Sequence, residues 1–489
     1  MTAGRERGSV AASFIRSALA AEGRFLTIDD LRAKFEEKKT QSRYSIERIP
    51  FRELDHWRFE PGSGNLVHDS GKFFRIEGLR VRTNFGGDRT WEQPIINQPE
   101  VGILGILTKQ FGGVRYFLMQ AKMEPGNINT VQLSPTVQAT KSNYTRVHQG
   151  KLPLFLEYFL DRTRFRVLFD QLHSEQGARF WRKRNRNMIV DTEANFVLPP
   201  DFYWLTLGQI KRLLAVDDFV NMDARSVLSC VPLGIETPGT REPARPAGRK
   251  GSPAEGLGSL KGFSRDMFLS ITDRSRSVSS SAEIISWFTE LKTRYECAAE
   301  LIPLKDVQDW VRTDREISHP SKKYFSIMAV SVRAECREVQ CWTQPLLRQA
   351  TVGLVGFLVK KIKGLLHVLV QAKVEAGYID MLELAPTVSF SETGPHAPRS
   401  GRPPFASHFL DPDPDRVRLS VILSEEGGRF YHSQNKYMII ELEPTSEIDL
   451  PENFAWMTFG QLLEFTQHSN YVNVETRSLL ACLNFGPKL

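Results

Sequence analysis

The chain carries one sequence pattern twice, about 251 residues apart. WEQP, which begins at Trp91, returns as WTQP at Trp342, and QAK, which begins at Gln120, returns at Gln371. SEQGARF returns as SEEGGRF, and the offset stays between 250 and 252 throughout. Each copy spans roughly 200 residues, far more than the unit of a solenoid repeat. The chain is therefore predicted to be a tandem duplication of one domain.

A stretch rich in Pro, Gly, Arg and Ser separates the two copies. It covers residues 235–262, and its composition is typical of a flexible linker. A chain of 489 residues is also too long for one hydrophobic core, so a division is expected. We predict a first module at residues 1–234 and a second module at residues 263–489.

Hydrophobic periodicity predicts an α+β fold in each module. Apolar residues three or four apart indicate two amphipathic helices within residues 9–38, the second capped by Thr27 or Asp29, and another helix at residues 206–216. In the second module, SAEIISWFTELKTRYE has the same helical pattern. Branched and aromatic residues, alternating in part, indicate strands at residues 73–83, 101–109, 114–124, 165–177 and 187–192. We expect mixed, strongly bent sheets with flanking helices.

Composition and motif content exclude several classes of protein. The chain has no run of eighteen apolar residues, and its five cysteines form no zinc-spaced cluster, so we expect a cytoplasmic protein without membrane segment or structural metal. GxGxxG, GxxxxGK[ST], HExxH and GxSxG motifs are missing, which disfavours nicotinamide and phosphoryl-transfer chemistry. The net charge of +7 fits an anionic partner, but the basic run WRKRNRN is more typical of a solvated face than of a nucleic-acid site.

The segment from Gln120 to Gly150 is unusually polar and is interrupted by turn-forming residues. A run so rich in donors and acceptors is costly to bury unless a polar ligand fills the pocket it makes. Lys122 and Glu124 alternate in a strand-like run and so face the same side. There they form either an acid–base pair or only a structural ion pair.

Other candidate residues also allow two interpretations each. Asn127 follows Pro-Gly and either binds a ligand or completes a turn. Tyr144 and His148 are either proton-transfer groups or ordinary satisfied side chains. Trp91 and Trp342 either stack on an aromatic base or pack in a core.

Comparison of the two copies divides this polar segment at Val137. The part before it recurs in the second module, which indicates a shared structural or binding role. After it, QATKSNYTRVHQG corresponds to the divergent SFSETGPHAPRSG. A site kept in the first module and eroded in the second explains this asymmetry.

These sequences resemble the NDP-hexose 2,3-dehydratases of deoxysugar biosynthesis. The resemblance rests on WEQPIINQPEVGILGI, on QAKMEPGNINTVQLSPTVQATKSNYTRVHQGK, on SEQGARF and on QAKVEAGYIDMLELAPTVSF, and it covers nearly everything except the linker. It implies Nudix-like modules, a homodimer, and conversion of dTDP-4-keto-6-deoxyglucose to dTDP-3,4-diketo-2,6-dideoxyglucose without metal or other cofactor. It also implies antibiotic biosynthesis and a downstream 3-ketoreductase that consumes the unstable product. No membrane or nucleic-acid partner is expected.

On this resemblance the first module is expected to be active and the second to be a degenerate or regulatory nucleotide-sugar site. The candidate catalytic residues are Glu124, Tyr144, His148 and Lys122. The candidate substrate-binding residues are Trp91, Gln120, Asn127, Gln132, Ser134, Thr136, Ser142, Asn143 and Arg146. The candidate second-site residues are Trp342, Lys373, Glu375 and Thr387. The alternative hypothesis is a non-catalytic nucleotide or nucleic-acid binding protein with two degenerate Nudix-like modules.

Overall fold

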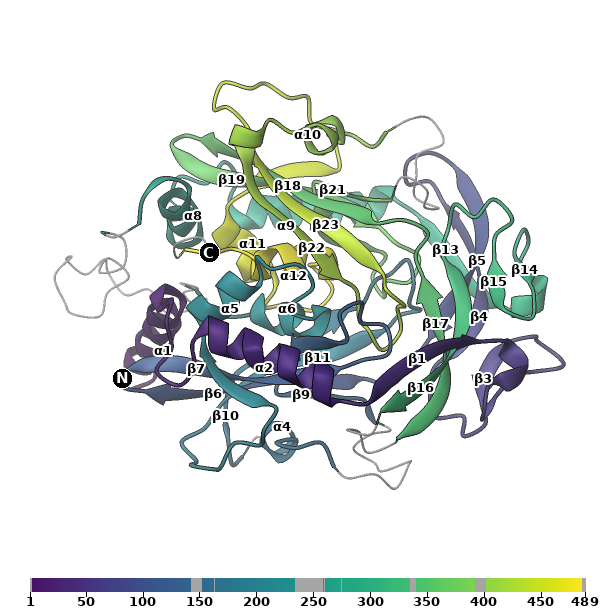
Figure 1. The fold of residues 1–489 in the computed structure, drawn as a ribbon. Helices are drawn as coiled ribbons and strands as arrows, with labels where there is room; N and C mark the ends of the chain where they lie inside the picture. The colour runs from purple at the N-terminus through teal and green to yellow at the C-terminus, as the bar shows by residue number, and fades with distance from the viewer. Residues whose placement is uncertain are drawn as a thin grey trace.

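Each module is built on a seven-stranded mixed sheet (Figure 1). The computed structural model describes residues 2–141, 152–161, 163–233, 258, 260–273, 275–334, 340–391 and 402–485. In the first module the large sheet has the order β10 (Arg166–Ser174), β11 (Arg184–Asp191), β6 (Gly102–Phe111), β7 (Val114–Met123) and β12 (Phe202–Thr206). Two short strands complete it, β8 (Val131–Ser134) on β7 and β9 (Val137–Ala139) on β6.

The second module repeats this sheet strand for strand. Its order is β22 (Val417–Ser424), β23 (Gln434–Glu441), β18 (Gly353–Ile362), β19 (Leu365–Val374) and β24 (Phe454–Met457), with β20 (Leu382–Pro386) on β19 and β21 (Val388–Phe390) on β18. In both sheets one pair is parallel, β6 with β11 and β18 with β23, beside antiparallel pairs. The expectation of duplicated α+β modules with mixed sheets is confirmed. Their Nudix-like character stays a prediction.

Two smaller sheets exchange a strand between the modules. The first contains β2 (Trp57–Phe59), β3 (Leu66–His68), β4 (Arg75–Thr83) and β5 (Arg89–Asn97), and its edge strand is β13 (Cys297–Ile302) of the second module. The second contains β14 (Val311–Arg312), β15 (Glu316–Ser318), β16 (Ser326–Ala334) and β17 (Cys341–Arg348), and its edge strand is β1 (Tyr44–Ile49) of the first module. The two modules are therefore interlocked, a feature that sequence similarity alone does not reveal.

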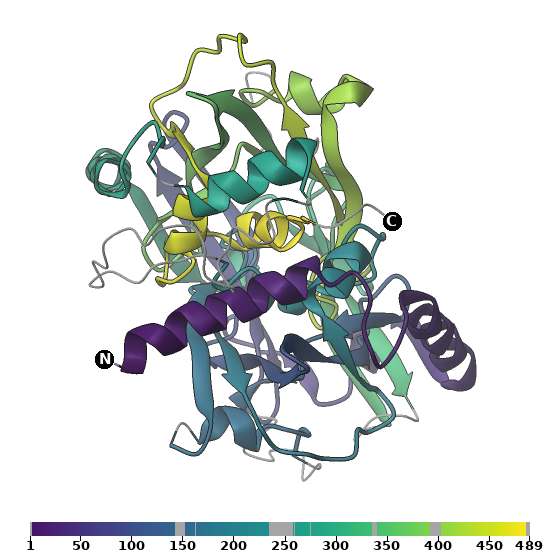
Figure 2. The ribbon, with the colours of Figure 1, turned by 90° about the vertical axis from the view of Figure 1, so that its left-hand side faces the viewer.

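The helices lie mainly between the large sheets, where the modules meet (Figure 2). Several begin with a capping box, in which the N-cap side chain accepts the backbone N–H three residues later and the side chain of that residue accepts the N-cap N–H. The N-cap residues are Thr27 and Thr206 in the first module, and Ser280 and Thr458 in the second. The first-module helices are α1 (Thr2–Leu19), α2 (Ile28–Gln41), η1 (Phe51–Glu53), α4 (Glu157–Leu160), α5 (Leu207–Leu213) and α6 (Met222–Leu228). Those of the second are α8 (Gly262–Thr272), α9 (Ser281–Arg294), η2 (Leu304–Asp306), α10 (Ser407–Leu410), η3 (Pro414–Arg416), α11 (Phe459–Phe465) and α12 (Val474–Ala481).

Two buried arginines join the modules reciprocally. Arg225 of α6 donates to the Ser478 hydroxyl at 3.2 Å and to the Ser424 carbonyl at 2.7 Å. Arg477 of α12 donates to Ser226 and to Ser174 in the same way, at 3.0 and 2.6 Å. Because a buried guanidinium is costly unless its donors are satisfied, these bonds fix one arrangement of the two modules.

Glycines allow two pairs of loops to meet across the same interface. Gly126 N–H donates to the Gly427 carbonyl at 2.6 Å, and Gly377 N–H donates to the Gly177 carbonyl at 2.8 Å. A Cβ added to Gly126 would lie 1.6 Å from the Phe430 carbonyl oxygen, and one on Gly377 would lie 1.9 Å from that of Phe180. The recurring glycines of the repeat are therefore required by backbone contact between modules.

The predicted helices and strands are present, with small differences at their ends. The helix predicted at residues 206–216 is the seven-residue α5, since Thr206 is its N-cap and Leu214 its C-cap. Thr27, and not Asp29, caps α2. Most of the predicted linker, residues 235–262, lies outside the described residues, so the module boundaries stay a prediction.

Candidate active site

A cleft of about 710 Å³ opens between the modules. The first module contributes β7, β9, α6 and the start of β11, with Lys122, Glu124 and Gln138 on the wall. The second module contributes β17 and the loop after β22, with Trp342 and Arg429. The cleft is therefore a composite of two stretches more than 200 residues apart in the chain.

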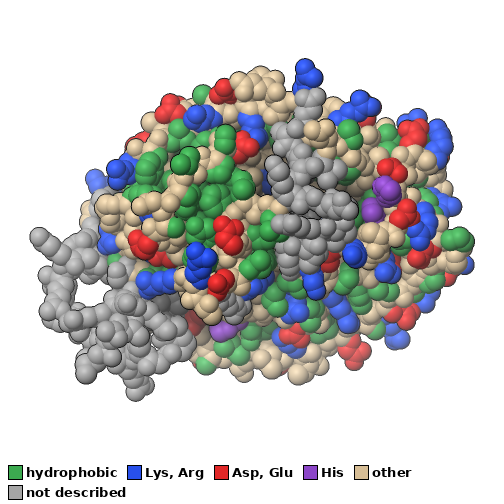
Figure 3. Space-filling view, turned by 90° about the horizontal axis from the view of Figure 1, so that it is seen from below, with side chains coloured by type: hydrophobic (Ala, Val, Ile, Leu, Met, Phe, Trp, Pro, Cys, Tyr) green, Lys and Arg blue, Asp and Glu red, His purple; other side chains and the backbone are tan. Residues whose placement is uncertain are grey.

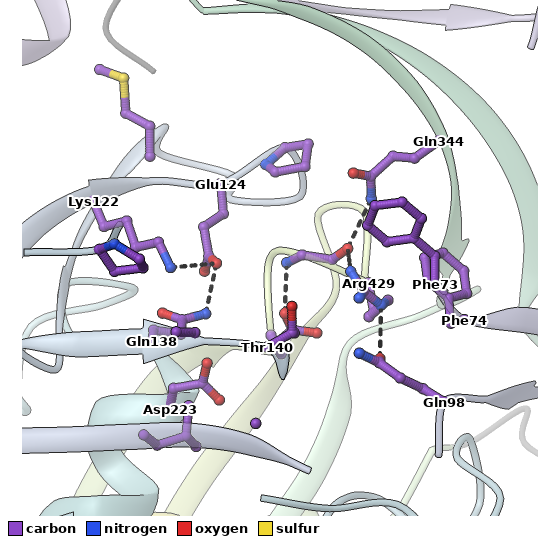
Figure 4. A pocket seen from close by; sticks show the side chains of 18 of the residues that line it. Phe73, Phe74, Gln98, Lys122, Glu124, Gln138, Thr140, Asp223, Gln344 and Arg429 are labelled. Atoms are coloured by element: carbon purple, nitrogen blue, oxygen red, sulfur yellow. Dashed lines mark hydrogen bonds and ion pairs between the residues drawn. The ribbon is translucent and has the colours of Figure 1, made fainter. Parts of the chain in front are cut away.

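The Lys122 ammonium and the Glu124 carboxylate meet at the end of β7 (Figure 4). Their alternation along the strand puts both on one side, with Lys122 Nζ 3.5 Å from Glu124 Oε1. Gln138 Nε2 donates to the same oxygen at 2.7 Å, and Asn221 in turn donates to Gln138 Oε1 at 3.3 Å. Glu124 is only 4% exposed, and its Oε2 has no hydrogen-bond partner among the described residues. One carboxylate oxygen is held as an acceptor while the other can take up a proton.

Three further carboxyl groups line the same cleft: the buried Glu175 and Asp223, and the half-buried Glu426. Burial, reinforced by Glu124 and Glu175, raises the pKa of Glu426 to about 7, although Arg429 opposes this. Burial and the neighbouring Glu426, Glu175 and Glu124 raise the pKa of Asp223 well above its ordinary value. Carboxyl groups crowded in this way do not all ionise together near neutral pH.

Lys183 adds a buried amine to this group. Its ammonium donates to the Glu100 carbonyl, and burial lowers its pKa to about 8. It belongs to the run WRKRNRN, for which a solvated face was the favoured interpretation. The structure corrects that interpretation, because Lys183 is 5% exposed and Asn187 1% exposed, and Arg186 is paired with Asp170 at 2.7 Å. The basic run leads into and forms part of β11.

The opposite wall is aromatic and cationic. The Arg429 guanidinium lies 4.2 Å from the centre of the Phe74 ring and donates to Gln98 Oε1 at 3.2 Å. Trp342 Nε1 donates to Gln344 Oε1 at 2.8 Å, and Gln344 donates to the Gly428 carbonyl at the same distance. Figure 4 shows Arg429, Gln344 and Phe74 across the pocket from Lys122 and Glu124. A wall of this kind suits a planar base and an anionic phosphate.

The predicted first-module residues fall into three groups. Gln120 and Thr136 line the cleft together with Lys122 and Glu124. Other predicted residues do not line it and are occupied by hydrogen bonds, those of Asn127 to Thr130, Gln132 to Ser424 and Ser134 to Gln120. The remaining predicted residues lie outside the described part of the chain: Ser142, Asn143, Tyr144, Arg146 and His148.

The two predicted tryptophans lie on the sides opposite to those expected. Trp342, predicted for a second-module site, lines the cleft that Glu124 also lines. Trp91, predicted for the first-module site, lines a space of about 30 Å³ with Val374 and Ala376 of the second module. The exchange of neighbouring strands explains this, because each small sheet presents its tryptophan to the other module.

In the second module the same frame holds a different set of groups. Lys373 Nζ lies 2.9 Å from Glu375 Oε1, and both side chains are buried. Thr387 is buried and donates to the Leu369 carbonyl at 2.5 Å, so it serves the sheet as Thr136 does in the first module. Glu475 takes the place of Asp223, and burial with the nearby Glu375 raises its pKa to about 8.

Sequence reasoning did not select Gln138, Glu175, Lys183, Asp223, Glu426 or Arg429 as site residues. One signal was present, because SEQGARF and SEEGGRF were recognised as repeats and differ by a glutamine at position 176 and a glutamate at 426. Their approach to Glu124 depends on packing between modules, and nothing in the sequence indicates it.

A family model for NDP-hexose 2,3-dehydratase matches the chain twice, at residues 29–231 and 281–483. Similar proteins include a dTDP-4-dehydro-6-deoxy-alpha-D-glucopyranose 2,3-dehydratase of Saccharopolyspora spinosa, 46% identical over 96% of this chain and 94% of that protein. A protein of the same name from Amycolatopsis orientalis is 45% identical, over 96% of this chain and 92% of its own length. Another, from Streptomyces violaceoruber, is 42% identical, over 93% and 96%.

The chain belongs to the NDP-hexose 2,3-dehydratase family. The two matched ranges coincide with the two structural repeats, so the family model describes one unit of the repeat. Among the described residues of this dehydratase, no group of three or more His, Cys, Asp or Glu is arranged to hold a metal ion. In the same part of the chain, every helix is too short or too polar to cross a membrane.

Proposed function

We propose that this protein removes the C2 hydroxyl of dTDP-4-keto-6-deoxyglucose and yields dTDP-3,4-diketo-2,6-dideoxyglucose. The observation that carries the proposal is the similarity, over nearly the full length, to proteins named as 2,3-dehydratases of dTDP-4-dehydro-6-deoxy-glucose. The composite cleft supports it, because buried proton-transfer groups face a wall suited to a nucleotide.

The chemistry needs a base and an acid on one sugar. The C4 ketone acidifies the hydrogen on C3, which a carboxylate removes, and an acid protonates the departing C2 hydroxyl. The enol that remains tautomerises to the 3,4-diketone, so the reaction is redox-neutral. Glu124 is proposed as the base, since it lines the cleft and its Oε2 has no hydrogen-bond partner among the described residues. Lys122 then stabilises the negative charge that develops on the ketone oxygen.

Tyr144 and His148 remain proposed proton-transfer groups. The described residues on either side of their segment, Thr140 and Pro153, both line the cleft. If either residue transfers a proton, Tyr144→Phe or His148→Gln lowers turnover about a hundredfold. Steady-state rates of the two variants test this, and a wild-type rate in both removes these residues from the mechanism.

Incubation with dTDP-4-keto-6-deoxyglucose and a trapping 3-ketoreductase tests the function. The expected product, followed by mass spectrometry, is a dTDP-2,6-dideoxyhexose that has lost one oxygen relative to the substrate. Absence of any deoxygenated sugar contradicts the proposal. Tight oligonucleotide binding that weakens steeply with salt would then favour the non-catalytic alternative. Positive and negative side chains are interspersed on the face drawn in Figure 3, and that face gives no support to the alternative.

Several finer features belong to the same proposal. We infer two Nudix-like modules joined by a linker at residues 235–262, a cytoplasmic homodimer, and a role in antibiotic biosynthesis beside a 3-ketoreductase. Sedimentation equilibrium tests the dimer, and limited proteolysis tests the linker. Cleavage confined to residues 235–262 is the expected result.

A further inference from the structure

The loops SEQGARF and SEEGGRF occupy equivalent places in the two modules. Each turns back on itself after a large-sheet strand and contacts the turn that follows the Lys–Glu pair of the other module. The contact is the same on both sides. A Cβ built on Gly427 would lie 2.9 Å from the Glu124 Cβ, and one built on Gly177 would lie 2.9 Å from the Glu375 Cβ. The backbone therefore gives the two loop contacts the same geometry.

Glu426 lies immediately before Gly427 in this contact. The Gly427 carbonyl accepts the Gly126 N–H, so Glu426 and Glu124 flank one hydrogen bond between the modules. Glu426 lines the first-module cleft, is half-buried, and accepts the Gly428 N–H at 3.1 Å through Oε1. The second module thus contributes a carboxyl group to the cleft of the first.

The equivalent position in the other loop carries an amide. Gln176 donates from Nε2 to Glu425 Oε2 in the second module. Because the two loops are equivalent, we expect the Glu426 side chain to lie against Glu175 as the Gln176 side chain lies against Glu425. A carboxyl group makes that donor contact only when it is protonated. Glu175 Oε2 is buried and has no hydrogen-bond partner among the described residues, which leaves it available for such a donor.

The charges around Glu426 favour one shared proton. Glu124, Glu175 and Asp223 face it from the first module, with Lys122 and Lys183 as the nearby cations, and Arg429 follows it in its own loop. Burial raises the pKa of Glu175 as it does that of Glu426, even though Arg477 and Lys183 oppose the shift at Glu175. Two carboxyl groups that cannot both ionise form an acid and its conjugate base.

We propose that Glu426, supplied by the second module, shares a proton with Glu175 and donates it to the C2 hydroxyl of substrate in the first-module cleft. The proposal rests on the proposed function. As the C3–H bond breaks, its proton passes to the base and its electron pair forms the C2–C3 double bond. The C2–O bond breaks with its electrons on oxygen, which takes the proton of Glu426 and leaves as water.

The chain offers two matched substitutions that test this role. Glu426→Gln and Glu383→Gln each replace a second-module carboxyl group, half-buried at Glu426 and buried at Glu383, by the glutamine that the first module carries at the equivalent position, Gln176 or Gln132. Burial raises the pKa of Glu383 to about 7, as it does for Glu426, but Glu383 does not line the cleft and accepts a hydrogen bond from Ser174 at 2.6 Å. A glutamine at position 383 still offers a side-chain oxygen that accepts the hydrogen bond of Ser174. The two variants therefore differ chiefly in access to substrate.

The expected result is a loss of about a hundredfold in kcat for Glu426→Gln and less than threefold for Glu383→Gln. Affinity for dTDP, measured by calorimetry, stays within threefold of wild type in both. In the wild type kcat/KM falls as pH rises through about 7, because the acid loses its proton. This fall in kcat/KM near pH 7 is expected to be absent in Glu426→Gln.

Three outcomes overturn the proposal, and they are distinguishable from failure of the proposed function. A wild-type kcat in Glu426→Gln, or equal losses in both variants, removes Glu426 as the acid while product still forms. A wild-type pH profile without the falling limb near 7 does the same, and this measurement needs no variant to fold. Wild-type enzyme that forms no deoxygenated product overturns the proposed function itself.

Discussion

Glu124 and Glu375 occupy the same place in two copies of one sheet, yet their surroundings differ. Glu124 receives a hydrogen bond from Gln138 and shares its cleft with a carboxyl group from the opposite loop. Around Glu375, the equivalent loop position is Gln176, and the turn carries Tyr378 where the first module has Asn127. A Cβ on Gly177 would lie 2.5 Å from the Tyr378 ring, so this ring packs directly against the turn.

This contrast separates two tasks that the repeat performs. The glycines and the buried arginines recur because the interface between modules needs them twice, and a Lys–Glu pair stands at the end of the equivalent strand in each module. Gln138 and Glu426 line the cleft and do not recur, since Ser389 and Gln176 stand at the equivalent positions, whereas Asp223 is matched by Glu475. We infer that duplication supplied the second wall of a composite site. Both modules then retained the residues of the interface, and the proton-transfer groups were retained in the first-module cleft.

The largest expected difference in turnover is between substitutions of Glu124 and Glu375. Glu124→Gln keeps an acceptor for Gln138 but removes the base, so turnover is expected to fall by about a hundredfold or more. Glu375→Gln, the matched variant in the second module, is expected to stay within tenfold of wild type. Initial rates of the two purified variants measure this. Similar losses in both would show that the second site takes part in catalysis.

The interface itself is expected to be symmetric. Gly126→Ala forces a Cβ against the Phe430 carbonyl, and Gly377→Ala forces one against that of Phe180. Each substitution is expected to destabilise the protein by about 1–3 kcal/mol, as overpacking does elsewhere. Thermal unfolding followed by circular dichroism tests this, with Gly62→Ala as a control, because Gly62 has open space around it and, like Gly126 and Gly377, no positive φ. A stable Gly126→Ala variant would contradict the close approach of the loops.

Local pattern predicted the elements of this fold, whereas it did not predict the partners of the exchanged strands. Thr27 and Thr206 mark helix starts because capping depends on neighbours within one turn. The pairing of β1 with β16 joins residues more than 250 positions apart, and nothing in either strand specifies it. The site follows the same division. Lys122 and Glu124 were predictable from alternation in one strand, but Glu426 and Trp342 reach the cleft only because the modules interlock.

A smaller difference is expected between the two tryptophans. Trp342 lines the first-module cleft, so Trp342→Ala is expected to raise KM for the nucleotide-sugar about tenfold if the ring stacks on thymine. Trp91→Ala, beside the small space of the second module, is expected to change KM less than twofold. Titration with dTDP measures the binding part directly. A larger increase in KM for Trp91→Ala than for Trp342→Ala would indicate that thymine binds beside Trp91, as the sequence predicts.

The smallest expected effect is a pH dependence of stability set by Glu475. Burial raises its pKa in the folded protein to about 8, so between its ordinary value of 4.5 and 8 the folded state binds more protons than the unfolded state. Stability therefore falls as pH rises through this window. Glu475→Gln cannot ionise, and its melting temperature relative to wild type is expected to increase by about 2 °C between pH 5 and pH 8. Scanning calorimetry at both pH values tests this. An unchanged difference would mean that Glu475 is ionised in the folded protein at both pH values, and burial would then not raise its pKa.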